Sequence, residues 1–148
     1  RWPLSGSRLH DISVRRREPR AAIETTVATP FGAIHVISVH FGLDIWERRR
    51  QATRLRAIAE AADTPVGVAL GDFNDWAWPG PVQRALTTVF PAFTAHRTFP
   101  ARMPVFKLDR LYCRPAGVLL GGFIDRSGSI ASDHLPLIVD LDPRKAAG

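Results

Sequence analysis

Polar residues that could do chemistry interrupt the apolar stretches of this 148-residue sequence at four places. A histidine ends "IHVISVH", and an acid and an amide follow in "GDFN". A further acid lies in "KLDRLY", and an Asp–His pair precedes "LPLIVDL". Because strand ends meet at one rim of a sheet, we expect these side chains to gather around a single cleft. They are His40, Asp72, Asn74, Asp109, Asp133 and His134.

This combination of residue types indicates metal-assisted phosphoester chemistry. Oxygen ligands without cysteine suit Mg²⁺ or Mn²⁺ better than structural zinc. A histidine beside a carboxylate suits proton transfer or charge stabilisation, because the carboxylate fixes the tautomer. An amide can hold a phosphate oxygen without adding charge. Together these groups suit attack of water on a phosphodiester.

Each motif also has a purely structural interpretation. "GDFN" could form a turn with Asx hydrogen bonds, and "SDH" could cap a strand. His40 could be a satisfied core histidine, and Asp109 could form an ordinary ion pair with a neighbour. A serine-based acyl hydrolase is disfavoured, because Ser132, Asp133 and His134 are merely adjacent in sequence and no G-x-S-x-G elbow occurs. The order and context of all four motifs favour one phosphoesterase site.

The first half of the chain predicts a hairpin followed by a helix. Residues 21–28 and 33–41 are β-branched and flank the turn "TPFG". Asp44 can cap the helix in "GLDIWERRRQATRLRAIAEAAD", with Glu47 three residues later as in a capping box. An apolar stripe at helical spacing follows: Ala52, Leu55, Ala59 and Ala62. The arginines of this helix are predicted to be solvated: Arg48, Arg49, Arg50, Arg54 and Arg56.

The second half predicts mostly strands. Residues 64–71 indicate a strand buried on both faces, and a short helix over 82–90 has Pro81 in its first turn. Residues 92–106 lack a period and read as a surface loop. Strands are expected at 107–113, 117–123 and 135–141, and a frayed tail at 142–148. An α/β layered sandwich fits this order better than a doubly wound parallel sheet.

Composition sets broad limits on class and partners. The length suits one domain, and 45% hydrophobic residues with a mean hydropathy of −0.05 argue against disorder. The net charge of +6 favours polyanionic partners, although an arginine-rich proteome produces the same balance. Cys113 is the only cysteine, which excludes an intramolecular disulfide. No apolar run is long enough to span a membrane, and no signal-peptide pattern opens the chain. The sequence leaves the location unknown, and the bacterial cytoplasm is the expectation.

The ordered segments "SVHFGLDIWERRRQATRL", "LGDFND", "LDRLYC" and "SDHLPLIVDL" resemble the second half of the endonuclease/exonuclease/phosphatase superfamily. This superfamily includes DNase-I-like nucleases, apurinic-site endonucleases, sphingomyelinases and inositol polyphosphate 5-phosphatases. The similarity runs from about Arg15 to Leu141, and "RREPRAAIE" resembles the segment upstream of the central strands. The resemblance implies a DNase-I-like four-layer α/β/β/α sandwich, of which residues 1–148 form the C-terminal half, with one mainly antiparallel or mixed sheet and its covering helices.

The resemblance also implies catalytic roles for matching residues. Asp72 would orient or deprotonate the attacking water, and Asn74 would hold that water or a phosphate oxygen. His134 would stabilise the developing charge or transfer a proton, with Asp109 orienting its ring. Asp75 matches no family position and is interpreted as a loop residue.

Three further roles concern metal and phosphate. Asp133 would help to bind Mg²⁺ or Mn²⁺, and His40 would contact the scissile phosphate. Arg17 or Arg20 could also contact phosphate, although their match is looser. Trp76 and Trp78 either form a ridge that stacks a base or touches lipid, or pack around Pro79 and Pro81.

One part of the family pattern is not matched. The N-terminal half of the family supplies a metal-binding Glu and an upstream Asn, whereas Glu18, Glu24 and Glu47 stand in other contexts. The sequence opens at Arg1 without an initiator Met. Either the chain is a fragment of a larger enzyme or the domain has lost catalysis, and the matched site favours a fragment. We then expect the N-terminal half, or a second copy, to cover an open sheet face.

The expected function is therefore a Mg²⁺-dependent phosphoesterase of the phosphodiesterase or nuclease type. The alternative is a non-catalytic module that binds nucleic acid or phospholipid. The sequence does not identify the substrate.

Overall fold

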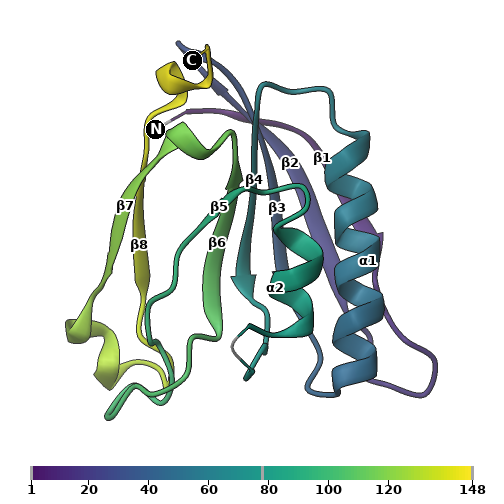
Figure 1. The fold of residues 1–148 in the computed structure, drawn as a ribbon, viewed down its shortest axis with the longest axis vertical. Helices are drawn as coiled ribbons and strands as arrows, with labels where there is room; N and C mark the ends of the chain where they lie inside the picture. The colour runs from purple at the N-terminus through teal and green to yellow at the C-terminus, as the bar shows by residue number, and fades with distance from the viewer. Residues whose placement is uncertain (1, 78, 148) are drawn as a thin grey trace.

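A six-stranded mixed sheet forms the centre of the computed structural model, which describes residues 2–77 and 79–147 (Figure 1). Its strand order is β1-β2-β3-β4-β6-β5, and only the β3–β4 pair is parallel. The mixed α/β class predicted from the sequence is confirmed. The strands are β1 (Leu4–Asp11), β2 (Ala21–Thr29), β3 (Gly32–His40), β4 (Val66–Asp72), β5 (Ala92–Phe93) and β6 (Asp109–Arg114).

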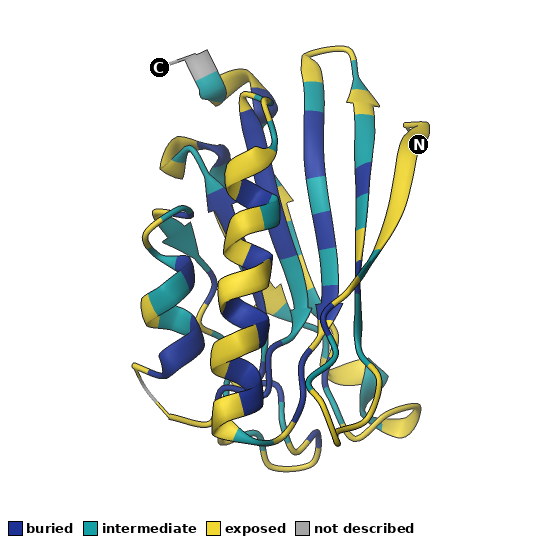
Figure 2. Cartoon of the chain, turned by 90° about the vertical axis from the view of Figure 1, so that its right-hand side faces the viewer, coloured by how far each residue is buried: buried dark blue, intermediate teal, exposed yellow. Residues whose placement is uncertain are grey.

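Helices α1 (Ile45–Ala61) and α2 (Pro81–Leu86) cover one face of this sheet (Figure 2). The predicted cap is confirmed, because the Asp44 carboxylate accepts from the backbone N–H groups of Trp46 and Glu47. Leu55 and Ala59 of α1 pack on Ile37 of β3 and Ala69 of β4 in the main hydrophobic core. Burial of this apolar stripe fixes α1 on the sheet and connects the parallel strands β3 and β4.

The second core lies on the opposite face. It contains Ile34 of β3, Val68 of β4 and Leu111 of β6, against which Val139 and Leu141 pack. Side chains of a strand alternate between faces, so the odd-numbered positions of β3 and β4 face the helices and the even-numbered positions face this second core. That alternation determines which face the polar strand ends will use.

A separate two-stranded sheet covers part of the second face. It consists of β7 (Leu119–Ile124) and β8 (Leu137–Leu141), which pair only with each other in the described part of the chain. In β8, Leu137, Val139 and Leu141 are partly buried, whereas Ile138 and Asp140 on the other face point to solvent.

Several local predictions were also wrong. The edge strand β1 was missed, because its sequence is polar and it is exposed along most of its length (Figure 2). Residues 92–106 contain β5, the buried Thr94 and Thr98, and a bridge between Phe99 and Phe106, so the segment is not simply a surface loop. Helix α2 ends at Leu86 and continues as a turn.

The chain end is ordered rather than frayed over the described residues. A 3₁₀ helix, η3 (Pro143–Ala147), follows β8. Asp142 accepts two side-chain hydrogen bonds from Arg144 and donates its backbone N–H to the carbonyl of Val118. Two further 3₁₀ helices are η1 (Ala116–Val118) and η2 (Arg126–Ile130). No helix within residues 2–77 and 79–147 is long and apolar enough to span a membrane.

The arginines of α1 are not all solvated as predicted. Arg48 is buried, and its guanidinium donates to the carbonyl of Leu43. Because Arg48 lies in the first turns of the helix, this contact ties α1 to the segment that leaves β3. The neighbouring Arg49 and Arg50 are exposed, in agreement with the prediction.

The Gly71→Ala substitution should destabilise the fold next to Asp72. Gly71 has φ +135°, and a Cβ there would lie 1.9 Å from the carbonyl oxygen of Val39 on β3. Because backbone must shift to relieve this clash, we expect the free energy of unfolding to fall by about 2 kcal/mol or more in chemical denaturation. Gly121→Ala is the matched control, since nothing lies within 4 Å of the added Cβ there. Equal unfolding midpoints for the two variants would contradict this account.

Candidate active site

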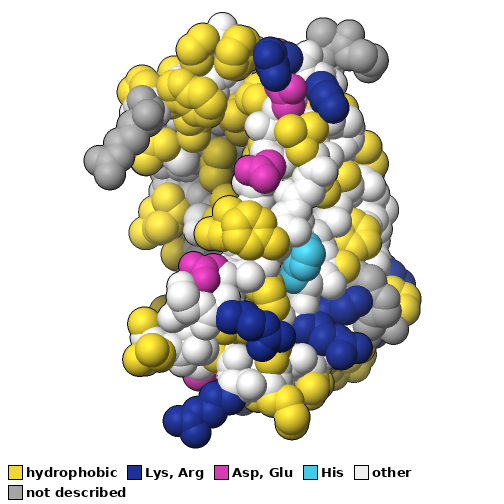
Figure 3. All heavy atoms as spheres, turned by 90° about the vertical axis from the view of Figure 1, so that its left-hand side faces the viewer, with side chains coloured by type: hydrophobic (Ala, Val, Ile, Leu, Met, Phe, Trp, Pro, Cys, Tyr) yellow, Lys and Arg dark blue, Asp and Glu magenta, His cyan; other side chains and the backbone are white. Residues whose placement is uncertain are grey.

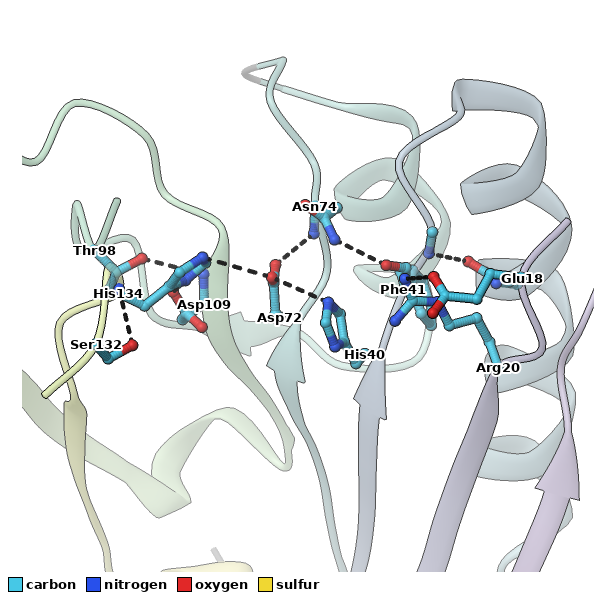
Figure 4. Close-up of polar contacts among 12 residues, drawn as sticks. Glu18, Arg20, His40, Phe41, Asp72, Asn74, Thr98, Asp109, Ser132 and His134 are labelled. Carbon is cyan, nitrogen blue, oxygen red and sulfur yellow. Dashed lines mark hydrogen bonds and ion pairs between the residues drawn. The ribbon is translucent and has the colours of Figure 1, made fainter. Parts of the chain in front are cut away.

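Strand register brings three of the predicted residues side by side. His40 of β3 stands opposite Asp72 of β4 in the parallel pair, and Asp72 stands opposite Asp109 of β6 in the antiparallel pair. All three occupy the face that carries the second core. His40 Nε2 lies 3.6 Å from Asp72 Oδ2, and Figure 4 shows the row of side chains across the strand ends. The sheet itself therefore builds the base of the site.

His134 completes this row from a loop. Its Nδ1 lies 2.7 Å from Asp109 Oδ2, and its Nε2 lies 3.9 Å from Asp72 Oδ2 (Figure 4). Because the Asp109 carboxylate accepts the Nδ1 proton, the ring is held with Nε2 towards Asp72. The backbone N–H of His134 donates to Ser132 Oγ, which fixes the turn before β8. The arrangement is an aspartate-oriented histidine facing a second carboxylate.

Asn74 fastens the loop that follows β4. It is buried and adopts a positive φ of +49°. Its backbone N–H donates to Asp72 Oδ1 at 2.8 Å, and its side-chain Nδ2 donates to the carbonyl of Phe41 at 2.8 Å. The Asx-turn interpretation of "GDFN" is therefore correct in geometry, and it coexists with a place in the site. The amide nitrogen of Asn74 already has a protein partner, so this residue orients Asp72 and joins the ends of β3 and β4.

Electrostatics shift the pKa values of the two central groups. Burial raises the pKa of Asp72, and the nearby Asp109 charge raises it further, against the opposing effects of the Asn74 N–H, His134 and His40. Burial alone would lower the pKa of His134. The hydrogen bond to Asp109 and the charges of Asp109, Asp72 and Asp133 outweigh burial, so the pKa of His134 is raised. Asp72 is thus a stronger base than a free carboxylate, and His134 is a weaker acid than a free imidazolium.

All six residues predicted to converge line one open cleft of about 510 Å³. Asp133 is exposed at its edge, and its carbonyl accepts from the backbone N–H of Ala101. Of the two candidate phosphate-binding arginines, Arg20 lines the cleft. Arg17 does not, and instead lies 3.1 Å from Asp44 at the start of α1. The remaining lining residues are Leu43, Trp76, Phe99 and Leu108.

The donor atoms of Asp72, Asp109 and His134 lie within 4.8 Å of one another, a spacing that could hold a metal ion. Two carboxylates are the ligands that Mg²⁺ and Mn²⁺ favour, since these ions bind through one or two carboxylates and retain waters. Asp133 lines the same cleft without belonging to this compact group. The residues present therefore fit a hard divalent cation.

Sequence reasoning missed a buried ion pair directly behind the site. Asp75, interpreted as a loop residue, is fully buried, as is Arg110. Arg110 Nη1 lies 3.7 Å from Asp75 Oδ2, and its Nη2 donates to the Asp75 carbonyl at 3.0 Å. The same guanidinium donates to the hydroxyl of Tyr112. Because Asp75 follows Asn74 and Arg110 follows Asp109, the pair links the two segments that carry site residues.

Trp76 lies in the loop that follows β4. Trp76 packs edge-on against Phe99 and Phe106, with ring centroids 5.9 and 4.7 Å away. It therefore forms a wall of the cleft rather than a free-standing ridge. Trp78 lies outside the described residues.

Comparisons with known proteins identify the family of the chain. A family model described as "Endonuclease/Exonuclease/phosphatase family" matches residues 1–134. The chain is 33% identical over 153 residues to "Uncharacterized protein YbhP" of Escherichia coli (strain K12), covering 95% of this chain and 60% of YbhP. The chain thus spans about 60% of the length of the curated relatives that it matches.

Two solved structures show the same fold. The endonuclease/exonuclease/phosphatase from Bacteroides vulgatus superposes with a TM-score of 0.75 at 17% identity, covering 95% of this chain and 66% of that one. The mannosyl-6-phosphatase of Bacteroides thetaiotaomicron superposes with a TM-score of 0.70 at 13% identity, covering 95% and 67%. At such identities the likeness concerns fold, and the expected DNase-I-like α/β fold is confirmed.

The Asp109→Asn substitution should lower the pKa of His134. The hydrogen bond and charge of Asp109 are the main contributions that raise this pKa against burial, and the amide removes the charge. NMR titration of the imidazole measures the change, with Glu60→Gln on the exposed face of α1 as control. Because the native pKa is raised, the stabilisation from this pair is complete below the unfolded value of about 6.5 and is lost as pH rises through the native value. An unchanged titration midpoint in Asp109→Asn would remove Asp109 as the cause.

The Asp75→Ala substitution should be strongly destabilising. It leaves the buried Arg110 guanidinium without its carboxylate, and breaking a buried pair costs about 3–5 kcal/mol. Glu60→Ala breaks the exposed Arg56–Glu60 pair instead and should cost about 0.5 kcal/mol or less. Chemical denaturation of both variants measures the difference. Similar costs would show that Asp75 behaves as the loop residue expected from the sequence.

Proposed function

Because the chain belongs to the endonuclease/exonuclease/phosphatase family, we propose that it is the C-terminal portion of a divalent-metal-dependent phosphoesterase that hydrolyses phosphodiesters. The observation that carries this proposal is the row Asp109–His134–Asp72–His40 at one rim of the sheet. An oriented imidazole beside a carboxylate of raised pKa suits proton transfer around an attacked phosphate. The matched family includes endonucleases, exonucleases and phosphatases, all of which act on phosphoesters.

Asp72 and His134 divide the proton chemistry in this proposal. Asp72, whose pKa is raised mainly by burial, accepts a proton from the attacking water. The water oxygen forms a bond to phosphorus as the bond from phosphorus to the leaving oxygen breaks. His134 is held by Asp109 with its Nε2 available. As an imidazolium it stabilises the charge that develops on the phosphate or donates a proton to the leaving oxygen.

His40 and Arg20 are the groups proposed to hold the phosphate. His40 is exposed at the strand end, so a substrate oxygen can reach its ring. Arg20 lines the same cleft, and its Nε is buried without a hydrogen-bond partner, while its Nη2 donates to Glu18. Asn74 would contribute by holding Asp72 and, through its oxygen, the water. Arg17 is the weaker candidate, because it is paired with Asp44 outside the cleft.

Mg²⁺ or Mn²⁺ is the proposed cofactor. Asp133 is the carboxylate of this chain proposed to bind the cation, and the donor atoms of Asp72, Asp109 and His134, which lie within 4.8 Å of one another in the same cleft, give it a negatively charged place to bind. A bound cation would act as a Lewis acid towards the phosphate. A further carboxylate would come from the upstream segment that the family resemblance implies.

That upstream segment would also cover the open sheet face. Leu4, Leu9 and Ile23 share the face opposite the helices and are more than half exposed. Burial of such apolar surface stabilises by about 25 cal/mol per Å². We propose that the N-terminal portion of the full-length protein, or a second copy of the chain, covers this surface.

The proposal is tested with the full-length protein and bis(p-nitrophenyl) phosphate. We expect hydrolysis to depend on added Mg²⁺ and to stop with a chelator. Asp72→Ala and His134→Ala should each lower kcat by about 100-fold or more without loss of fold, because Asp72 lies at a strand end and His134 in a loop, both outside the two cores. Asp63→Ala, an exposed aspartate at the other end of α1, is the matched control. Near-unchanged turnover would remove a residue from the mechanism, and a wild-type protein without activity would favour the non-catalytic binding module.

A further inference from the structure

The loops around the cleft present large apolar side chains to solvent. They lie at the end of the six-stranded sheet where β3 and β4 terminate (Figure 1). Trp46 is 67% exposed and Met103 is 72% exposed. Large apolar side chains gathered on loop tips are not explained by core packing, and such patches mark binding surfaces. The exposed apolar residues of the loop before α1, the first turn of α1 and the loop 99–106 are Leu43, Ile45, Trp46, Met103 and Val105, here called the rim.

The rim stands on two sides of the cleft. Leu43 lines the cleft from the segment before α1. On the other side, Phe99 lines the cleft and forms a β-bridge with Phe106, and Met103 and Val105 lie in the loop that this bridge closes. The backbone bond from Ala101 to the carbonyl of Asp133 fixes this loop against the site. A surface that contacts both sides of the rim would therefore lie directly over the cleft.

Basic side chains accompany the rim. The Arg49 guanidinium lies 4.7 Å from the centroid of the Trp46 ring, and Arg102 is exposed beside Met103. Arg15 and Arg16 are exposed in the β1–β2 loop at the same end of the sheet. On the side of the molecule that carries β7 and β8, Figure 3 also shows Lys and Arg side chains beside hydrophobic ones towards the lower end. Apolar side chains that insert between lipids and basic side chains that attract anionic headgroups together complement an anionic membrane surface.

The rim fits lipid better than nucleic acid. Single-stranded nucleic acids stack bases on open aromatic faces. Arg49 covers one face of Trp46, and Trp76 packs edge-on against Phe99 and Phe106. The other rim residues are aliphatic or methionine, which gain free energy from acyl chains and nothing from stacking.

We propose that the rim docks the protein on an anionic phospholipid bilayer and brings the cleft to the phosphodiesters of lipid headgroups. The docking stands on the exposed rim alone. The headgroup as substrate rests on the phosphoesterase function proposed above.

Sedimentation with vesicles tests the docking. The full-length protein should bind vesicles containing phosphatidylglycerol more tightly than vesicles of phosphatidylcholine alone. The double variant Trp46→Ser/Met103→Ser should bind the anionic vesicles about tenfold more weakly or worse, because it removes two apolar side chains from the contact. Phe31→Ser is the matched control, since Phe31 is 53% exposed in the β2–β3 hairpin at the opposite end of the sheet. It should bind like wild type.

Three results would overturn the docking. The first is equal vesicle binding by wild type and the double variant. The second is a loss of binding in Phe31→Ser equal to that in the double variant. The third is a protein that does not bind vesicles but binds single-stranded DNA through Trp46 and Met103, which would assign the rim to nucleic acid. Hydrolysis of bis(p-nitrophenyl) phosphate is measured separately, and the double variant should retain it. Vesicle binding without hydrolysis would count against the proposed function alone, and hydrolysis without vesicle binding would count against the rim.

Discussion

The lateral register of β3, β4 and β6 is the constraint on which the site depends. His40, Asp72 and Asp109 lie next to one another because the three strands pair without a shift at this point. A slip of one residue would send a site residue to the helix-covered face. The register is held by apolar side chains on both faces, such as Ile37 towards the helices and Ile34 towards the second core. Core packing therefore sets the distances between the site residues.

The placement of like charges at this register has an energetic cost that the structure offsets locally. Asp72 and Asp109 face the same cleft, and their repulsion contributes to the raised pKa of Asp72. The Asp109 carboxylate accepts a short hydrogen bond from His134, whereas the Asp72 carboxylate accepts one from the backbone N–H of Asn74. Each carboxylate thus has its own partner. Behind the site, the buried Arg110 side chain holds the loop through Asp75.

The sequence was most informative where an apolar strand ends in a polar residue. All six residues line one cleft. Strand alternation explains this for His40, Asp72 and Asp109, whereas Asn74, Asp133 and His134 reach the cleft from the loops next to β4 and β8. The helix with its Asp44 cap could also be predicted, because the cap acts through neighbours in sequence. The catalytic and metal-binding roles of these residues stay predictions.

Features that depend on distant partners could not be predicted in the same way. The edge strand β1 is polar and is identified only by its pairing with β2. The pairing of β7 with β8 apart from the large sheet leaves no mark in either sequence, since both read as ordinary strands. Asp75 and Arg48 carry charges that normally point to solvent, and their burial follows from how α1, α2 and the β4 loop meet. A composition rule that places charge outside cannot detect a buried pair.

The strand residues of the site and the exposed residues of the rim differ in how their positions are fixed. The site residues His40, Asp72 and Asp109 lie on strands whose register is fixed by the two cores, so only a shift of a whole strand would change their spacing. Met103 lies in a loop and Trp46 in the first turn of α1, and both are largely exposed, so they can change without disturbing the cores. A fold of this kind can keep one hydrolytic geometry while its loops are altered to suit different surfaces. Substrate choice is therefore expected to reside in the rim, whereas the chemistry resides in the register of the strands beneath it.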